Sequence, residues 1–340
     1  MRTLLLAATA AFALALPASA QEEPKGARAP SEIVADAPAA DWVAIPAEDL
    51  LVMTLAPDVD GKPRQVVIQL MPAPFSQGWV HNIRLFARAK WYDGISVNRV
   101  QDNYVTQWGD PNYDNPEATG QAKPLPQGLK VMRENCYLVG QISTACNPIG
   151  FDELEGLSAV AEDSDVDVAN RRDPFALWTF HWNGWQLAMS QRPNDREWET
   201  WPTHCYGMVG VGRNYSPDTG SGAELYTVIG HAPRHLDRNI ALVGRVIEGM
   251  QHLSSLPRGS GALGFYTAEE SAKRTSILSV RVASDLAPSE QPSFEYLSTE
   301  SSTFATYAKA IANRRDPFFI APAGGADICN IRVPVRRVAE

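Results

Sequence analysis

The sequence offers few side chains that could perform chemistry, and Arg99 is the most informative of them. It lies in a short predicted strand over 96–100, and Gln107 lies in the next one, over 104–107. An arginine stays charged at every physiological pH and presents its donors as a rigid fork. Arg99 can therefore donate hydrogen bonds to a substrate atom on which an electron pair becomes localised during a reaction. The alternative interpretation of Arg99 is a salt bridge on the protein surface.

Other kinds of catalytic site have little support. His231 and His235 are four residues apart, and on a helix both would face one metal ion, but they lie in a segment that predicts a loop. The sequence contains no Gly-x-Ser-x-Gly motif, which forms the nucleophile turn of many serine hydrolases. We therefore predict neither a metal site nor hydrolase chemistry.

The chain contains four cysteines, which are Cys136, Cys146, Cys205 and Cys329. An even number in an oxidising compartment indicates disulfides, and four cysteines allow three connectivities. The spacing lacks a CxxC pair, which disfavours a metal site. We expect Cys136–Cys146 and Cys205–Cys329 bonds. A Cys146–Cys205 bond and buried reduced thiols are the alternatives.

The first 20 residues have the pattern of a secretory signal peptide. Arg2 precedes an apolar run over 4–16, and Pro17 is followed by Ala18-Ser19-Ala20, a typical cleavage site. The run is too short for a membrane span of about 20 residues; a buried core helix is the alternative. We expect an exported protein, located in the periplasm, without a membrane span. Its net charge of −9 argues against nucleic acid as a partner.

The elements that must position Arg99 and Gln107 are mostly strands. Hydrophobic patterning predicts strands over 50–55, 66–70, 96–100, 104–107, 208–212, 225–229, 241–246 and 277–283. The first two are joined by a turn-rich loop at 60–63, which indicates a hairpin. Helical spacing predicts helices over 75–91, 249–253 and 301–313. A long helix near each end of a mainly β chain favours a closed barrel plugged by helices.

The remaining segments lack clean periodicity. Residues 21–41 are rich in Pro, Ala and Glu and predict a flexible arm. Residues 111–203 are irregular, and five tryptophans between 178 and 201 form either the small core of this segment or a platform for a peptide. The predicted division is 1–20 signal peptide, 21–41 arm, 42–284 barrel interrupted by an insertion at 111–203, and 285–340 C-terminal extension.

Three blocks of sequence, taken together, resemble the cyclophilin family of peptidyl-prolyl cis-trans isomerases. The first block is Val66–Leu70 with the helix that ends before Tyr92-Asp93-Gly94, and the second is the segment 97–110. The third block comprises Gly207–Arg213, 221–226, Leu236-Asp237 and 243–250. The resemblance covers 50–110 and 204–284. It implies a mainly β fold, a cyclophilin-like closed eight-stranded antiparallel barrel capped by two helices, here with a large irregular insertion and a C-terminal extension.

The resemblance also implies roles for individual residues. Arg99 falls where the family keeps its catalytic arginine. The positions that match the substrate groove are Tyr104, Val105, Gln107, Gly212, Arg213, Glu224, Tyr226, His235 and Leu236. Three positions depart from the pattern: Asn98 and Ile240 stand where histidine is frequent, and His235 stands where many members have tryptophan. Proline binding should survive these changes, whereas cyclosporin binding should be weakened.

The implied reaction agrees with the chemistry available to Arg99. An Xaa-Pro amide rotates over a barrier of about 18–20 kcal/mol because conjugation of its nitrogen must be broken. Lowering that barrier requires an apolar pocket for the proline ring and a cation aimed at the nitrogen, with no metal or cofactor. We therefore expect an isomerase that acts on proline-containing polypeptides and assists the folding of exported proteins. The alternative is a non-catalytic proline-peptide binding module, or holdase, on the same scaffold.

Overall fold

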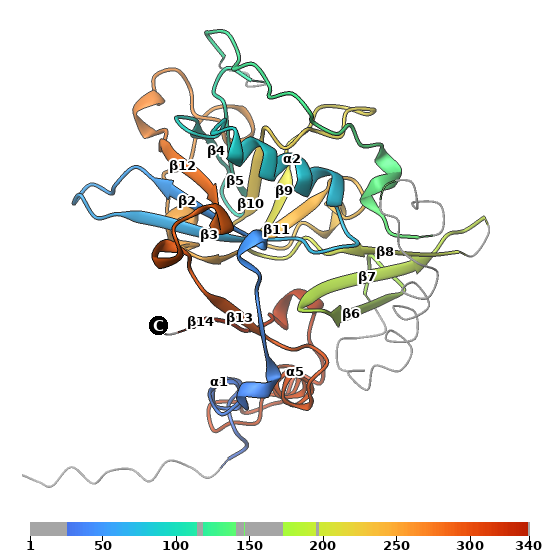
Figure 1. Ribbon diagram of the computed structural model, residues 1–340. Coiled ribbons are helices and arrows are strands. Elements are labelled where there is room, and N and C mark those ends of the chain that lie inside the picture. The colour runs from blue at the N-terminus through green and yellow to red at the C-terminus, as the bar shows by residue number, and fades with distance from the viewer. Residues whose placement is uncertain (1–25, 114–117, 141–145, 147–172, 195–196, 339–340) are drawn as a thin grey trace, which may run out of the picture.

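The computed structural model describes residues 26–113, 118–140, 146, 173–194 and 197–338 (Figure 1). The predicted signal peptide and much of the predicted insertion lie outside these residues. Within the described part of the chain, no helix combines the length and the apolar character needed to cross a membrane.

The largest unit is an antiparallel eight-stranded sheet that curls into a barrel, as predicted (Figure 1). Along the sheet its strands are β12 (Ile277–Val282), β2 (Leu50–Leu55), β3 (Arg64–Leu70), β11 (Leu242–Glu248), β9 (Met208–Val211), β10 (Leu225–Val228), β5 (Val105–Gly109) and β4 (Ser96–Val100). The two edges approach each other beside β4 and β12. There the Val97 amide donates to the Thr275 carbonyl at 2.9 Å and the Ile277 amide donates to the Ile95 carbonyl at 2.8 Å. These bonds nearly close the barrel.

Two helices pack on the barrel core. In α2 (Gln77–Arg88), Trp79, Ile83 and Phe86 recur at helical spacing and are at most 1 % exposed. The short helix α4 (Gln251–Ser254) adds Leu253, which is fully buried in the same cluster. The buried Asn82 side chain donates to the carbonyls of Lys130 and Ser221, so α2 also fixes two loops.

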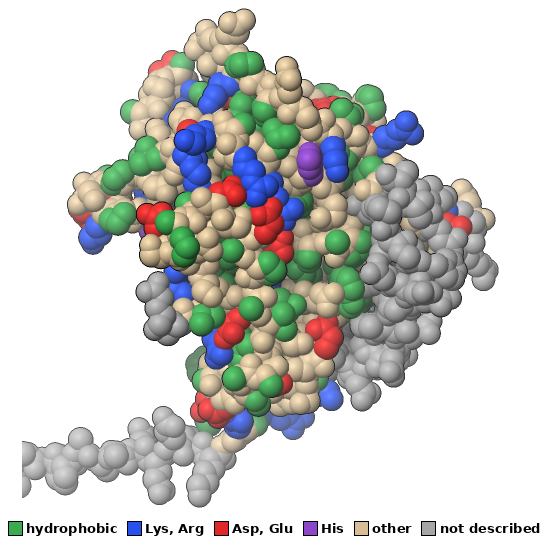
Figure 2. Space-filling view, in the orientation of Figure 1, with side chains coloured by type: hydrophobic (Ala, Val, Ile, Leu, Met, Phe, Trp, Pro, Cys, Tyr) green, Lys and Arg blue, Asp and Glu red, His purple; other side chains and the backbone are tan. Residues whose placement is uncertain are grey.

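The outer face of α2 is polar. Acidic and basic side chains are intermixed over this helix in Figure 2. Arg88 pairs with Glu48 and Asp285, and Arg84 pairs with Asp49. Acidic side chains of the neighbouring segments therefore pair with the arginines of α2 on this face.

The end of the predicted insertion is more regular than its sequence suggested. It forms a three-stranded antiparallel sheet of β6 (Trp178–Trp182), β7 (Trp185–Gln191) and β8 (Trp198–Pro202). Asn183 and Gly184 join β6 to β7 with φ of 47° and 80°, which is the backbone that a two-residue hairpin turn needs. Trp185 and Trp201 are each 1 % exposed, so these two form part of a core.

The N-terminal arm and the last helix differ from the prediction. Residues 30–35 form a helix, α1 (Pro30–Ala35), instead of a flexible arm, and its Ile33 is buried against α5 (Ser302–Ala312). Helix α5 therefore does not plug the barrel, since its Phe304 belongs to this separate cluster. A small sheet accompanies it, formed by β1 (Trp42–Ala44), β13 (Phe294–Leu297) and β14 (Val335–Arg337). The apolar residues of the N-terminal segment pack against those of the C-terminal extension. The sequence of either segment alone does not indicate this contact.

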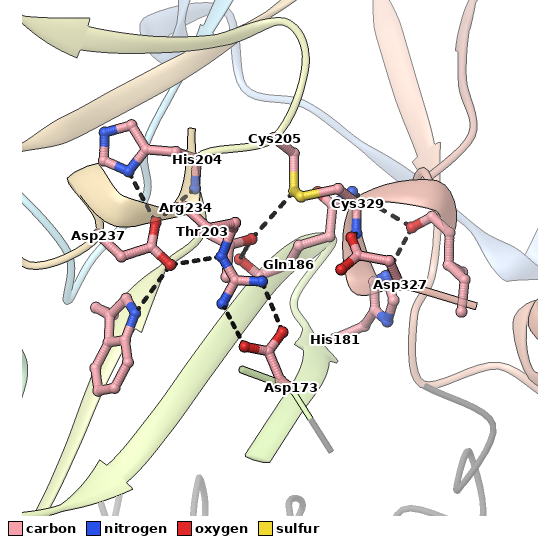
Figure 3. The surroundings of a disulfide bond; sticks show 12 residues. Asp173, His181, Gln186, Thr203, His204, Cys205, Arg234, Asp237, Asp327 and Cys329 are labelled. Carbon is pink, nitrogen blue, oxygen red and sulfur yellow. Dashed lines mark hydrogen bonds and ion pairs between the residues drawn. A yellow bond between two sulfur atoms is a disulfide. The ribbon is translucent and has the colours of Figure 1, made fainter. Parts of the chain in front are cut away.

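Both predicted disulfides are present, and no free cysteine remains. Cys136 and Cys146 close a short loop in the insertion. Cys205, just before β9, is joined to Cys329 of the C-terminal extension (Figure 3). The second bond fastens the extension to the barrel.

Candidate functional site

A cavity of about 720 Å³ opens on the outer face of the barrel, over β4, β5, β9 and β10. Its lining includes Arg99, Tyr104, Val105, Gln107, Ala118, Gly212, Arg213, Asn214, Tyr215, Glu224, Tyr226, Leu236, Ile240, Leu263 and Phe265. Strand alternation explains the composition of its floor. In β5 and β10, Trp108 and Leu225 point into the barrel core, whereas Gln107 and Tyr226 point outward.

A bulge in β4 aims Arg99 at this cavity. Val97 pairs with Trp108, but the next pair is Arg99 with Gln107, so Asn98 is an extra residue in the strand. The buried Asn98 side-chain amide donates to the Gly109 carbonyl at 3.0 Å, which ties the bulged residue to β5. Arg99 and Gln107 thus lie side by side on the outer face.

The Arg99 guanidinium is held from several directions. Its Nε donates to the Leu263 carbonyl at 2.7 Å and its Nη1 to Gln107 Oε1 at 3.1 Å, while its Nη2 donates to Gln101. The rings of Tyr104 and Phe265 lie 5.6 and 5.5 Å from its central carbon. Such contacts fix a cation without a directly bonded carboxylate.

Burial lowers the pKa of Arg99 below its usual value, against the opposing effects of Tyr104, Glu224 and Tyr226. Burial likewise raises the pKa of Tyr104 and raises that of Tyr226 well above its usual value. A guanidinium remains protonated at neutral pH, because its ordinary pKa lies above 12. The site therefore presents a partly desolvated positive charge beside neutral phenols.

Beside Arg99 lies an apolar patch that is separate from the barrel core. Val105, Tyr226 and Val228 are each at most 4 % exposed and pack together, with Tyr104 and Ile240 at their edge. Because this cluster is on the outer surface of the sheet, it can hold an apolar group from outside. A cation next to an apolar cavity suits a ligand whose polar amide adjoins a compact ring.

The opposite side of the cavity is polar. Gln107 donates from its Nε2 to Glu224 Oε2 at 2.8 Å. A Cβ on Gly212 would lie 2.9 Å from Glu224 Cβ, so glycine allows these two strands to approach here. Arg213 turns its guanidinium to the carbonyls of Asn239 and Asn214.

The structure brings together nine of the ten residues that the sequence analysis singled out for catalysis and binding. These nine are Arg99, Tyr104, Val105, Gln107, Gly212, Arg213, Glu224, Tyr226 and Leu236. The tenth, His235, is exposed and does not line the cavity. It stacks on Tyr104 instead, with ring centroids 6.5 Å apart.

Sequence reasoning missed the contributions of Leu263 and Phe265. They lie in the irregular stretch between α4 and β12, where neither periodicity nor a turn motif marks them. Leu263 has a φ of 55° and Gly264 a φ of 82°, and this turn presents the Leu263 carbonyl to Arg99. The signal that could have located the turn is Gly261 with Gly264, which bracket it.

The comparisons with known proteins concern the family and the fold. The family described as "Cyclophilin type peptidyl-prolyl cis-trans isomerase/CLD" matches residues 63–282. No curated protein matches the chain.

Among solved structures, the chain is similar to the cyclophilin AquaCyp293 from Hirschia baltica, with 19 % identity and a TM-score of 0.61 over 90 % of this chain and 96 % of that one. That likeness concerns the fold. Two structures of a cyclophilin-type peptidyl-prolyl cis-trans isomerase from Cryptosporidium parvum match 68 % of this chain at 10 % identity. The matches span 96 % of the chain in the first structure and 97 % in the second, with TM-scores of 0.37 and 0.36. The second structure was solved in the presence of the dipeptide Ala-Pro.

Proposed function

The chain belongs to the cyclophilin-type peptidyl-prolyl cis-trans isomerase family, and from this premise we propose that it catalyses rotation about Xaa-Pro bonds in polypeptides. The observation that carries the proposal is the position of Arg99. It is held at the edge of an apolar patch on the outer face of the barrel, within the same cavity as Tyr226 and Leu236.

The proposed mechanism begins with the proline ring in the apolar patch formed by Val105 and Tyr226. As the amide twists, its nitrogen loses conjugation and gains a localised lone pair. A hydrogen bond from Arg99 to that nitrogen stabilises the twisted state more than either planar isomer. The free energies of the two planar isomers therefore change little, while the barrier between them falls.

The hydrogen bonds of Arg99 are compatible with this role. A guanidinium has five N–H groups, and the contacts with Leu263, Gln107 and Gln101 engage one on each of its three nitrogens. Both Nη atoms therefore keep one N–H outside those contacts, and these are the proposed donors to substrate. No bond to the substrate is made or broken, so the proposal includes no cofactor and no metal.

We also propose that the protein is exported and assists the folding of proteins in an oxidising compartment. The two disulfides support this location, because such bonds persist outside the reducing cytosol. The signal-like pattern over 1–20 supports it as well. N-terminal sequencing of protein recovered from the periplasmic fraction should begin at Gln21, whereas a chain retained in the cytoplasm with Met1 intact would contradict export.

An isomerisation assay on a short peptide with one Ala-Pro bond tests the activity. The folded protein should accelerate the approach to cis–trans equilibrium in proportion to its concentration. A protein that binds the peptide without acceleration would contradict the isomerase proposal and identify the chain as a non-catalytic binding module.

A further inference from the structure

We propose that His204 and Asp237 are positioning residues for the proline pocket, and that the ion pair of Asp173 with Arg234 connects them to the insertion. This inference rests on the proposed function, because it assigns a role within the same site. It extends that function to buried groups which do not line the cavity.

The first part of the connection joins the pocket floor to His204. The Tyr226 hydroxyl lies 3.0 Å from His204 Nε2, and the imidazole is fully buried. On the other side of the ring, His204 Nδ1 lies 2.9 Å from Asp237 Oδ1, which also accepts a hydrogen bond from the His204 backbone amide (Figure 3). One carboxylate therefore fixes both the backbone and the ring of the residue that holds Tyr226.

The charge of Asp237 determines where the protons lie. Burial acts to raise the pKa of this carboxyl, but the hydrogen bond from His204 and the charge of Arg234 hold the pKa below its usual value. The ionised carboxylate only accepts hydrogen bonds, so His204 Nδ1 must carry a hydrogen. Nε2, on the other side of the ring, is then the atom that pairs with the Tyr226 hydroxyl.

A glycine in the neighbouring strand makes room for this connection. Tyr226 pairs with Gly210 across β10 and β9. A Cβ on Gly210 would lie 2.4 Å from both Cζ and the hydroxyl oxygen of Tyr226, so the phenol passes directly over the Gly210 backbone. The residue types at these positions are thus mutually adapted: a tyrosine long enough to reach His204 and a glycine small enough to let it pass.

Asp237 also fixes the pocket wall. It directly follows the short 3-10 helix η5 (Arg234–Leu236), whose Leu236 lines the cavity. Asp237 Oδ2 accepts from Arg234 Nε at 2.6 Å and from Trp201 Nε1 at 3.3 Å. The floor residue Tyr226 and the wall residue Leu236 therefore share one anchor.

The second part of the connection leads to the insertion. Arg234 bonds to Asp173 at 2.8 Å through Nη1, and both side chains are at most 4 % exposed (Figure 3). Trp201 belongs to β8, which is also part of the predicted insertion. The cost of removing two charges from water offsets much of the attraction in a buried ion pair, so this pair is weak evidence for added stability. The insertion would thus set the position of the pocket wall through Arg234 and Asp237.

A positioning role predicts a particular kinetic pattern. The pocket holds the proline ring in the planar and twisted states alike, so loosening it should weaken binding with little effect on the rate of rotation in the complex. A purely structural role would instead reduce the fraction of folded protein and leave the affinity of the remainder unchanged.

The test is the affinity of a short Ala-Pro peptide, together with its cis–trans exchange rate when bound, both measured by NMR. His204→Leu should raise the dissociation constant about five-fold, which corresponds to one lost neutral hydrogen bond. The exchange rate of the bound peptide should change less than two-fold. In a Tyr226→Phe background, which already lacks the hydroxyl, His204→Leu should add much less than five-fold.

Two further variants complete the design. Asp173→Asn should weaken binding in the same direction, because it removes the charge that pairs with Arg234 and leaves the pair of Arg234 with Asp237 in place. Asp93→Asn is the matched control: it breaks the Asp93–Arg281 pair, which does not line the cavity, and should leave affinity unchanged. If His204→Leu does not fold, Asp173→Asn compared with Asp93→Asn still reports whether the buried connection sets the affinity.

An unchanged dissociation constant in folded His204→Leu, or equal effects in both backgrounds, would overturn the proposed role of His204. A wild-type protein that binds the peptide without accelerating its isomerisation would contradict the proposed function alone, since the affinities would still report on positioning. Failure of the wild type to bind any Xaa-Pro peptide would overturn both proposals.

Discussion

Removing the Cys205–Cys329 disulfide should destabilise the protein more than removing Cys136–Cys146. The former joins residues 124 positions apart and the latter residues 10 apart. In the chain-entropy treatment, a crosslink restricts the unfolded chain more as its loop lengthens. The estimate is about 5 kcal/mol for the long loop and about 3 kcal/mol for the short one. Because the two loops do not overlap in sequence, the two effects should be additive.

The assay is urea unfolding of two double variants, Cys205→Ala with Cys329→Ala and Cys136→Ala with Cys146→Ala. Tryptophan fluorescence and circular dichroism should give coincident transitions, and the difference in unfolding free energy between the variants is the quantity of interest. The long-loop variant should be less stable by about 2 kcal/mol. Equal stability, or a less stable short-loop variant, would refute the reasoning and show that the extension is held mainly by its apolar contacts.

Three further predictions concern the insertion sheet and the C-terminal extension. Burial lowers the pKa of His181 from 6.5 to about 4, so below pH 6.5 the unfolded chain binds a proton that the native protein does not. The free energy of unfolding should therefore fall by up to about 3 kcal/mol between pH 6.5 and 4, and urea titrations of His181→Leu should lack this component. Gly184 has a φ of 80°, and Gly184→Ala would place a Cβ 2.6 Å from the Tyr296 ring. The free energy of unfolding should therefore fall by about 1–3 kcal/mol, measured by thermal unfolding. An unchanged midpoint would contradict the turn assignment. Ser301 accepts from the Phe304 amide at the start of α5, so Ser301→Ala should cost about 1 kcal/mol in urea unfolding, while Ser301→Asp should retain stability.

Most of the cavity could be predicted because three blocks of sequence resemble the cyclophilin family, and the barrel strands could be predicted because their patterning is local. Arg99 and Gln107 lie on two short strands that are adjacent in the sequence. The bulge at Asn98, which places them on the same face, has no such pattern. Its Asn98 side chain donates to the Gly109 carbonyl, a contact that exists only after the strands pair.

Other features depend on contacts between distant segments. Helix α5 has an apolar face, but that face alone does not indicate whether it covers the barrel or α1. His204 likewise carries no local motif, and its importance appears only when Tyr226 and Asp237 come within hydrogen-bond distance. The hairpin at Asn183-Gly184 is different, since an Asn-Gly pair between aromatic runs is a local signal that the irregular composition of its surroundings obscured.

The most direct test of the isomerase proposal compares the wild-type protein with Arg99→Ala and with the control Arg281→Ala, whose arginine pairs with Asp93 and does not line the cavity. The catalysed rate of Ala-Pro isomerisation should fall at least ten-fold in Arg99→Ala, which is about 1.4 kcal/mol of barrier, and should be unchanged in the control. Circular dichroism should show that both variants are folded. A folded Arg99→Ala protein with undiminished activity would contradict the account.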